Sequence, residues 1–111
     1  MKISDLTHNT IKKLNSRLYS WDFGLQTLLS DIGTDPVCYI TGSKIDLEET
    51  SSYHLDHKIP KCRGGDNSLD NCGLVLSDVN FAKHKMSLED FVEMCKTVVE
   101  GNGYEVKKKA N

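Results

Sequence analysis

The stretch "YHLDHKIPKCRGGDNSLDNCGLVLSDVNFAKHK" covers residues 53–85 and decides how this chain folds. Residues 51–57 (SSYHLDH) favour a strand that ends before Pro60, because proline cannot donate to a ladder. Residues 73–77 (GLVLS) are too short and apolar to stand as a helix and favour a second strand. A short helix follows over "SDVNFAKHK", with Ser77 as its expected N-cap. The order strand, long loop, strand, helix predicts a ββα unit.

The residues before this unit read mainly as helix. Ile11, Leu14 and Leu18 recur at helical spacing between residues 10 and 20. A second apolar cluster, from Trp21 to Ile32, indicates a further short helix that ends near Gly33. Residues 37–42 (VCYITG) are typical of a short strand and turn.

After the unit, "SLED" at residues 87–90 is a capping box that opens another helix. Its expected apolar stripe is Phe91, Met94, Cys95 and Val98, and "GNG" at residues 101–103 ends it. We therefore expect an α+β protein with a helical segment over 1–36, a ββα domain over 37–100 and a flexible tail over 101–111.

Composition sets the broad class. A chain of 111 residues predicts one domain, and 38% hydrophobic with 27% charged residues is typical of a soluble globular protein. No apolar run approaches the roughly 20 residues of a membrane span, so we expect no membrane association. The N-terminus has no apolar core of a secretory signal, and we expect a cytoplasmic protein.

Four cysteines, Cys38, Cys62, Cys72 and Cys95, raise the question of a metal or disulfide framework. None of them forms a C-x-x-C pair, the usual mark of a structural zinc site. We expect reduced thiols and no structural zinc. Cys95 is expected in the core face of its helix, and Cys38 in the core face of a strand.

The decisive stretch carries the parts that phosphodiester hydrolysis needs. Asp56 offers a carboxylate and Asn80 an amide oxygen, both suited to Mg²⁺, with Mn²⁺ or Ni²⁺ able to substitute. His57 offers a neutral imidazole as general base. Neighbours on a regular strand point to opposite faces, so Asp56 and His57 share a cleft only if the strand bends or ends there. Asn71 lies where the loop returns and can brace it and orient His57.

Basic residues surround these candidates although the net charge is −2. Such a charge argues against grip by bulk electrostatics and favours transient contact with DNA, with a protein partner to recruit the chain. The expected DNA contacts are Lys58, Lys61, Arg63 and Lys83. Two histidines stay ambiguous: His54 and His84 are either accessory site residues or ordinary packed and surface side chains.

These residues, in this order and spacing, resemble the HNH endonucleases, the ββα-metal nucleases whose motif reads D-H, then N, then N-x-x-K. The likeness covers about residues 38–95 and rests on "DH-x-x-P", "GG", a lone Asn, "LVL" and "N-x-x-K". It implies that Asp56 and Asn80 bind the metal and that His57 is the base. It also implies that Asn71 is the central asparagine and that Lys83 is the motif's helix lysine.

The family cleaves DNA with a divalent cation and leaves a 5′-phosphate and a 3′-hydroxyl, and the likeness implies the same here. Two departures stand out. Cys38 is the only remnant of the zinc knuckles of many relatives, and His54 stands where relatives often carry an acid. Two alternatives remain: a non-catalytic nucleic-acid-binding or assembly module that retains the fold, and a toxin nuclease held by an inhibitor. Target sequence and oligomeric state are not encoded in any motif.

Overall fold

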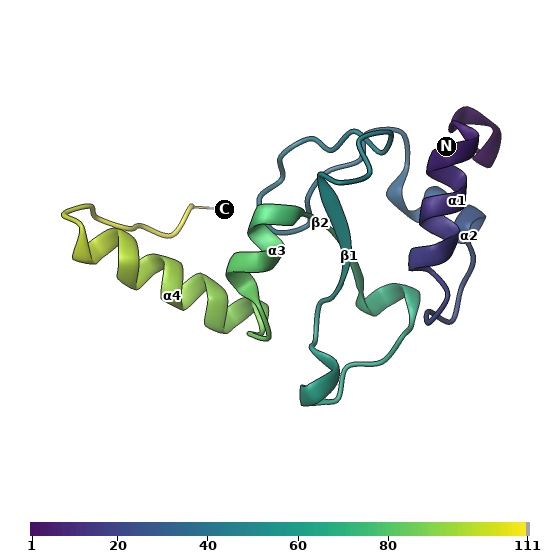
Figure 1. Ribbon diagram of the computed structural model, residues 1–111. Helices are drawn as coiled ribbons and strands as arrows, with labels where there is room; N and C mark the ends of the chain where they lie inside the picture. Colours follow the sequence, from purple (N-terminus) through teal and green to yellow (C-terminus); the bar gives the residue numbers. More distant parts are fainter. Residues whose placement is uncertain (111) are drawn as a thin grey trace.

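The structure, a computed structural model, describes residues 1–110 of the 111-residue chain. Short 3₁₀ turns cover Ile3–Asp5, Lys61–Arg63 and Leu69–Asn71. The longer elements follow the order α1 (His8–Arg17), α2 (Leu25–Ile32), β1 (Tyr53–His57), β2 (Cys72–Leu76), α3 (Ser77–Lys83) and α4 (Leu88–Gly101). In Figure 1 the sheet lies at the centre, with α1 and α2 on one side and α3 and α4 on the other.

The strands β1 and β2 pair in antiparallel register, with Asp56 opposite Gly73 and His57 opposite Cys72. The chain passes directly from β2 into α3, which packs against both strands. The predicted α+β class and ββα order are thus confirmed. The predicted cap is wrong, because Leu76 is the N-cap and Ser77 is the first helical residue. The Ser77 hydroxyl does not cap the helix and donates instead to the carbonyl of Ser51 (2.8 Å).

The N-terminal helices form where the apolar spacing predicted them. Thr7 caps α1 by accepting the backbone N–H of Thr10, and α2 ends at Gly33, whose φ of 77° favours glycine. Glu48 reaches across from a distant loop to accept the hydroxyls of both threonines. This contact ties the start of α1 to the loop that leads into β1.

The predicted strand over residues 37–42 is wrong. Within this described segment the chain turns instead, and an isolated bridge joins Val37 to Lys44. Gly42 has a φ of 76°, and its N–H donates to the carbonyl of Cys38 (2.9 Å), so the backbone reverses before a strand can extend. Cys38 is buried as expected, although it lies in a turn.

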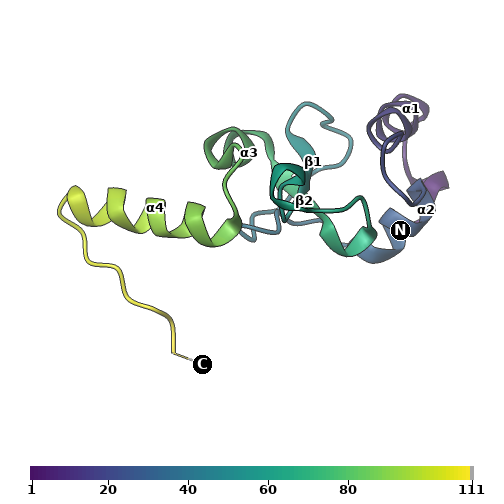
Figure 2. The ribbon, with the colours of Figure 1, turned by 90° about the horizontal axis from the view of Figure 1, so that it is seen from below.

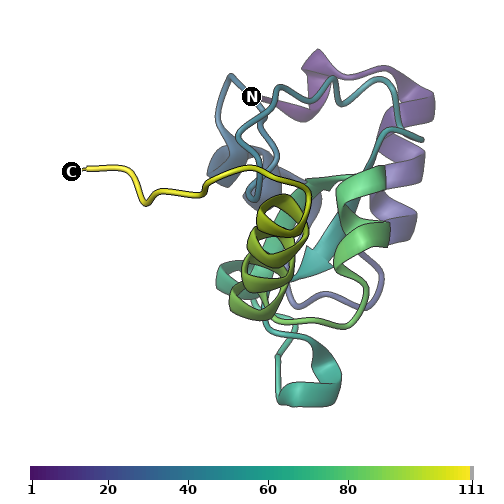
Figure 3. The ribbon, with the colours of Figure 1, turned by 90° about the vertical axis from the view of Figure 1, so that its left-hand side faces the viewer.

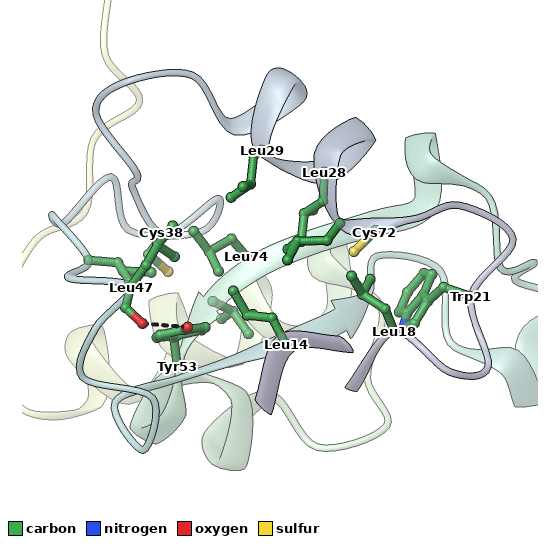
Figure 4. Packing of buried hydrophobic residues seen from close by; sticks show 13 residues of the cluster. Leu14, Leu18, Trp21, Leu28, Leu29, Cys38, Leu47, Tyr53, Cys72 and Leu74 are labelled. Atoms are coloured by element: carbon green, nitrogen blue, oxygen red, sulfur yellow. Dashed lines mark hydrogen bonds between the residues drawn. The ribbon is translucent and has the colours of Figure 1, made fainter. Parts of the chain in front are cut away.

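The core lies between the sheet and the N-terminal helices. Leu14 of α1 and its C-cap Leu18 meet Leu28 and Leu29 of α2 over the sheet. Tyr53 closes the far end with a hydroxyl bond to the Leu47 carbonyl (2.7 Å; Figure 4). Burying apolar side chains of this size contributes about 1.5–3 kcal/mol each. The N-terminal helices are therefore bound firmly to one face of β1.

The helix α4 behaves differently, because it projects from the body (Figures 1 and 2). Ser87 caps it by accepting the N–H of Asp90, as predicted, and Phe91 is its buried residue. The prediction that Cys95 lies in the core is wrong: its side chain is exposed. The flexible tail expected over 101–111 includes Asn111, which lies outside the described residues.

Candidate active site

The face of β1 that points toward α3 carries His54 and Asp56, because alternate residues of a strand share a face. The helix adds Asn80 and Lys83, which share one side of α3 at a spacing of three residues. The structure brings these candidates together through two contacts. Lys83 lies beside Asp56, and Asn80 lies beside His54.

Asp56 is held by one ion pair and one hydrogen bond. The ammonium of Lys83 lies 3.1 Å from its Oδ2, and the hydroxyl of Tyr39 donates to the same oxygen at 2.6 Å. The Lys83 side chain is fully buried, whereas Asp56 remains 13% exposed. Lys83 was expected to contact DNA, but its ammonium is buried and neutralises the Asp56 carboxylate inside the protein.

Tyr39 is a site residue that the sequence did not point out. Its ring lies so close to Gly73 that a Cβ there would meet ring atoms at 2.5 Å. Burial, and then the carboxylate of Asp56, raise the pKa of Tyr39 well above its usual range. The hydroxyl consequently stays protonated and donates a hydrogen bond to Asp56. A glycine inside a strand is the one available signal, because it often marks close approach by another group.

His54 and Asn80 form a second pair on the same face. The amide nitrogen of Asn80 lies 2.9 Å from Nδ1 of His54, and the edge of the His54 ring meets Phe81 at a centroid distance of 5.3 Å. With the amide nitrogen directed at His54, the amide oxygen of Asn80 points elsewhere. His54 is thus packed against α3 and also within reach of the candidate metal ligands.

His57 occupies the opposite side of the strand. Its ring stacks on Trp21 at a centroid distance of 4.1 Å and an interplanar angle of 15°. Its Nε2 lies 2.9 Å from the amide oxygen of Asn67. An amide oxygen only accepts, so Nε2 carries the hydrogen and Nδ1 keeps its lone pair. Neither Trp21 nor Asn67 was expected from the sequence, because both contacts join residues that no motif connects.

Asn71 braces the loop between the strands, as the sequence suggested. Its side chain is buried; it accepts the N–H of Ile59 (2.8 Å) and donates to the carbonyls of Ile59 (3.1 Å) and Asp66 (2.9 Å). The contact with the imidazole comes from Asn67 instead. Asn71 therefore supports the loop on which Asn67 lies.

One cavity joins the two sides of the strand. It encloses about 330 Å³ and is lined by Asp56, His57, Pro60, Lys61, Cys62, Lys83, His84 and Lys85. Two of the predicted DNA contacts, Lys58 and Arg63, do not line this cavity. Lys58 leans over the Tyr39 ring, Arg63 pairs with Asp90 on α4 (2.9 Å), and His84 ends α3 with a φ of 52°.

A divalent cation fits the donor chemistry of this site. Within residues 1–110 no cluster of three or more His, Cys, Asp or Glu could hold a metal. A carboxylate with an amide oxygen nevertheless suits Mg²⁺, which keeps several waters and phosphate oxygens among its ligands. The buried Lys83 ammonium finds no hydrogen-bond partner of good geometry in the described chain. The ammonium of Lys83 is therefore the cation that pairs with Asp56 in this structure. An additional hydrogen-bond acceptor beside Lys83 would satisfy its N–H groups.

The geometry defines a small ββα domain with an Asp-His pair at the end of its first strand. Comparison with protein families finds a match to the HNH endonucleases over residues 38–87. The chain therefore carries a domain of the HNH endonuclease family, which indicates a nuclease acting on nucleic acid. Searches of curated proteins and of solved structures gave no match.

The elements of the described chain also bear on membranes. None of the helices within residues 1–110 combines the length and the apolar character that crossing a bilayer requires.

Proposed function

We propose that this protein is a metal-dependent DNA endonuclease that acts at the cavity between β1 and α3. The observation that carries the proposal is that Asp56 and His57 line one cavity inside a domain of this family. Lys61 and Lys85 bring positive charge to its rim, where a phosphate would enter.

Asp56 and Asn80 would hold one divalent cation, Mg²⁺ by preference and Mn²⁺ or Ni²⁺ in its place. Such an ion, when bound, neutralises charge on the phosphate and on the leaving oxygen. Asp56 is available for this because its carboxylate lies on the α3 face, 13% exposed. Tyr39 keeps the carboxylate in position through its hydroxyl bond of 2.6 Å.

His57 accepts the proton of the attacking water at Nδ1, because Nε2 is occupied by Asn67. The water oxygen bonds to phosphorus, and the bond from phosphorus to the 3′ oxygen breaks. The products are a 5′-phosphate and a 3′-hydroxyl. Asn71 maintains the loop, and the stack on Trp21 limits rotation of the imidazole.

The DNA backbone is contacted by Lys58, Lys61 and Arg63, and Arg63 exchanges its exposed partner Asp90 for phosphate. Lys83 serves as the counter-ion of Asp56 in the free protein. His54 and His84 are accessory, the first beside Asn80 and the second at the cavity. With a net charge of −2, the chain works with a partner that brings it to its target.

Supercoiled plasmid incubated with the purified chain tests the proposal. We expect nicking that requires Mg²⁺ and stops with EDTA. His57→Ala should lower the rate by roughly 10²–10⁴-fold, the usual worth of a general base. His8→Ala is the matched control, since His8 is exposed at the start of α1 and far from the cavity in sequence.

The rival function is a non-catalytic nucleic-acid-binding or assembly module that retains the fold. A folded wild type that binds DNA but leaves plasmid intact with Mg²⁺, Mn²⁺ and Ni²⁺ would establish the rival. Equal rates for the His57→Ala and wild-type chains would also refute the proposed role of the base.

A further inference from the structure

The helix α4 has two unlike sides. Its polar residues are Glu89, Asp90, Glu93, Lys96, Thr97 and Glu100. At 100° per residue these cover one side, and all apolar side chains fall on the other. Much of that apolar side is solvent-exposed: Val92 and Val98 are each 55% exposed, Met94 40% and Val99 39%.

Apart from the segment that follows α4, the described chain leaves this face uncovered. Phe91 is the buried residue of α4, and Arg63–Asp90 is its ion pair with the body. Figures 1 and 2 show α4 projecting away from the β1–β2–α3 unit, and Figure 3 looks almost along the helix. A contiguous exposed apolar face of this kind marks an interaction site.

The segment after α4 adds a groove to this face. Val106, Lys107 and Lys108 come back beside Val92, Cys95 and Val99, and together they enclose about 520 Å³. Lys96 also lines the groove. Its floor is thus apolar and its rim positively charged, so it fits an apolar helix that carries acidic residues.

The first half of α4 has that composition. Leu88 and Val92 stand beside Glu89 and Glu93. A parallel pair of α4 helices would set these acids against one another. An antiparallel pair sets them beside Lys96 and the lysines of the partner's groove, and it also opposes the helix dipoles favourably.

We propose that α4 is a dimerisation helix and that it pairs antiparallel with α4 of a second copy of this chain. The two-fold axis passes near Cys95, the middle of the uncharged face, so that the same surface serves both copies. A dimer carries two copies of the cavity and can cut both strands of a duplex in one encounter; this last consequence rests on the proposed function.

Sedimentation equilibrium of the full chain tests the pairing without reference to activity. We expect a mass twice the 12.5 kDa of one chain. Val98→Glu places a charge at the interface and should shift the protein to monomer. Thr97→Glu adds the same charge one residue away, on the polar side, and should leave the dimer intact.

Val98 is more than half exposed in the single chain, so Val98→Glu should keep its fold, which circular dichroism verifies. A wild type that sediments as monomer over the whole accessible concentration range overturns the proposal. A Val98→Glu variant that remains as dimeric as the wild type overturns it too.

Thiol cross-linking tests whether the Cys95 side chains of the two copies lie close together, as a two-fold axis near Cys95 requires. Cys62 and Cys95 are the exposed cysteines, while Cys38 and Cys72 are buried. Diamide should link two chains through Cys95, oxidising both thiols to one disulfide. The covalent dimer should persist in Cys62→Ser and disappear in Cys95→Ser. A covalent dimer lost in Cys62→Ser, or absent from a protein that sediments as dimer, refutes the placement of the two-fold axis near Cys95.

Discussion

The two sides of strand β1 are built from different parts of the chain. On the α3 side, the partners of Asp56 are Tyr39 and Lys83, both within the matched family segment 38–87. On the opposite side, His57 stacks on Trp21, which precedes that segment. The α3 side is thus complete within the family domain, whereas the His57 side also uses the N-terminal helical segment. We therefore infer that the proposed metal ligand and the proposed base respond to different substitutions.

The largest expected effect is on the α3 side. Asp56→Asn leaves the buried Lys83 ammonium without its carboxylate and should lower the free energy of unfolding by about 3–5 kcal/mol. Adding Lys83→Met removes the stranded charge and should restore most of that loss. Urea unfolding of the two single variants and the double variant measures the coupling between the side chains.

If the double variant were as unstable as Asp56→Asn alone, the pair would not be the source of the loss. Restored stability should come without restored cleavage, because the proposed metal ligand is still missing. The double variant should therefore regain stability while its cleavage activity stays low.

On the opposite side, Trp21→Leu should lower the free energy of unfolding by about 3 kcal/mol, since a large buried side chain is partly replaced. Cleavage should fall as well, because His57 loses the ring that limits its rotation. Thermal unfolding and plasmid nicking measure the two effects at a temperature where the variant is folded. Leu18→Ala, which removes a core side chain next to Trp21, controls for stability loss alone; equal activity losses in the two variants would argue against the stack.

Tyr39→Phe should have a smaller effect, about 1.5 kcal/mol, from loss of a hydrogen bond to a charged acceptor. Calorimetric titration with Mn²⁺ should show weaker binding, because Asp56 loses a positioning contact. Tyr53→Phe removes the same atom on the core side, where the hydroxyl donates to a backbone carbonyl. It should lower stability without changing Mn²⁺ binding, and similar Mn²⁺ affinities in both variants would contradict the role of Tyr39.

The smallest expected effect on stability concerns Glu48, which accepts hydrogen bonds from Thr7 and Thr10 at the start of α1. Hydrogen bonds, chiefly from Thr7, lower the pKa of Glu48 below its ordinary value of 4.5. A carboxylate with a lowered folded pKa stabilises the fold above the unfolded pKa, and this contribution disappears as the pH falls through the folded pKa. Glu48→Gln should therefore be less stable than wild type near pH 7, and the difference should be smaller near pH 3.

Urea unfolding at both pH values measures this difference. Glu49→Gln is the control, because Thr7 and Thr10 bond to its neighbour and not to it. A difference for Glu48→Gln that grows on acidification would contradict the assignment.

Local patterns predicted most of the fold. The spacing of Leu14 and Leu18, and the apolar run 74–76, act over a few residues and produced α1 and β2 close to where they were expected. The failures have non-local causes. Residues 37–42 have strand-forming side chains, but their backbone bonds with Ser43 and Leu74 hold a turn. Cys95 follows a core-like spacing, yet no element of the described body packs over it.

The site divides in the same way. Asp56, Asn80 and Lys83 belong to a motif and could be picked out from the sequence. Their supporting residues could not, because Tyr39 and Trp21 approach from segments 17 and 36 positions away, and no periodicity encodes such contacts. The burial of Lys83 likewise depends on how α3 lies on the sheet.

The paired glycines of the loop carry a last consequence. At Gly65 a Cβ would lie 1.7 Å from the Ile59 carbonyl oxygen, whereas Gly64 has open space around it and a φ of 92°. If the codons for positions 64 and 65 are randomised and folded variants are selected, the two positions should accept different residues. Asparagine and aspartate, which enter the left-handed region most readily, should recover at 64, while only glycine should recover at 65.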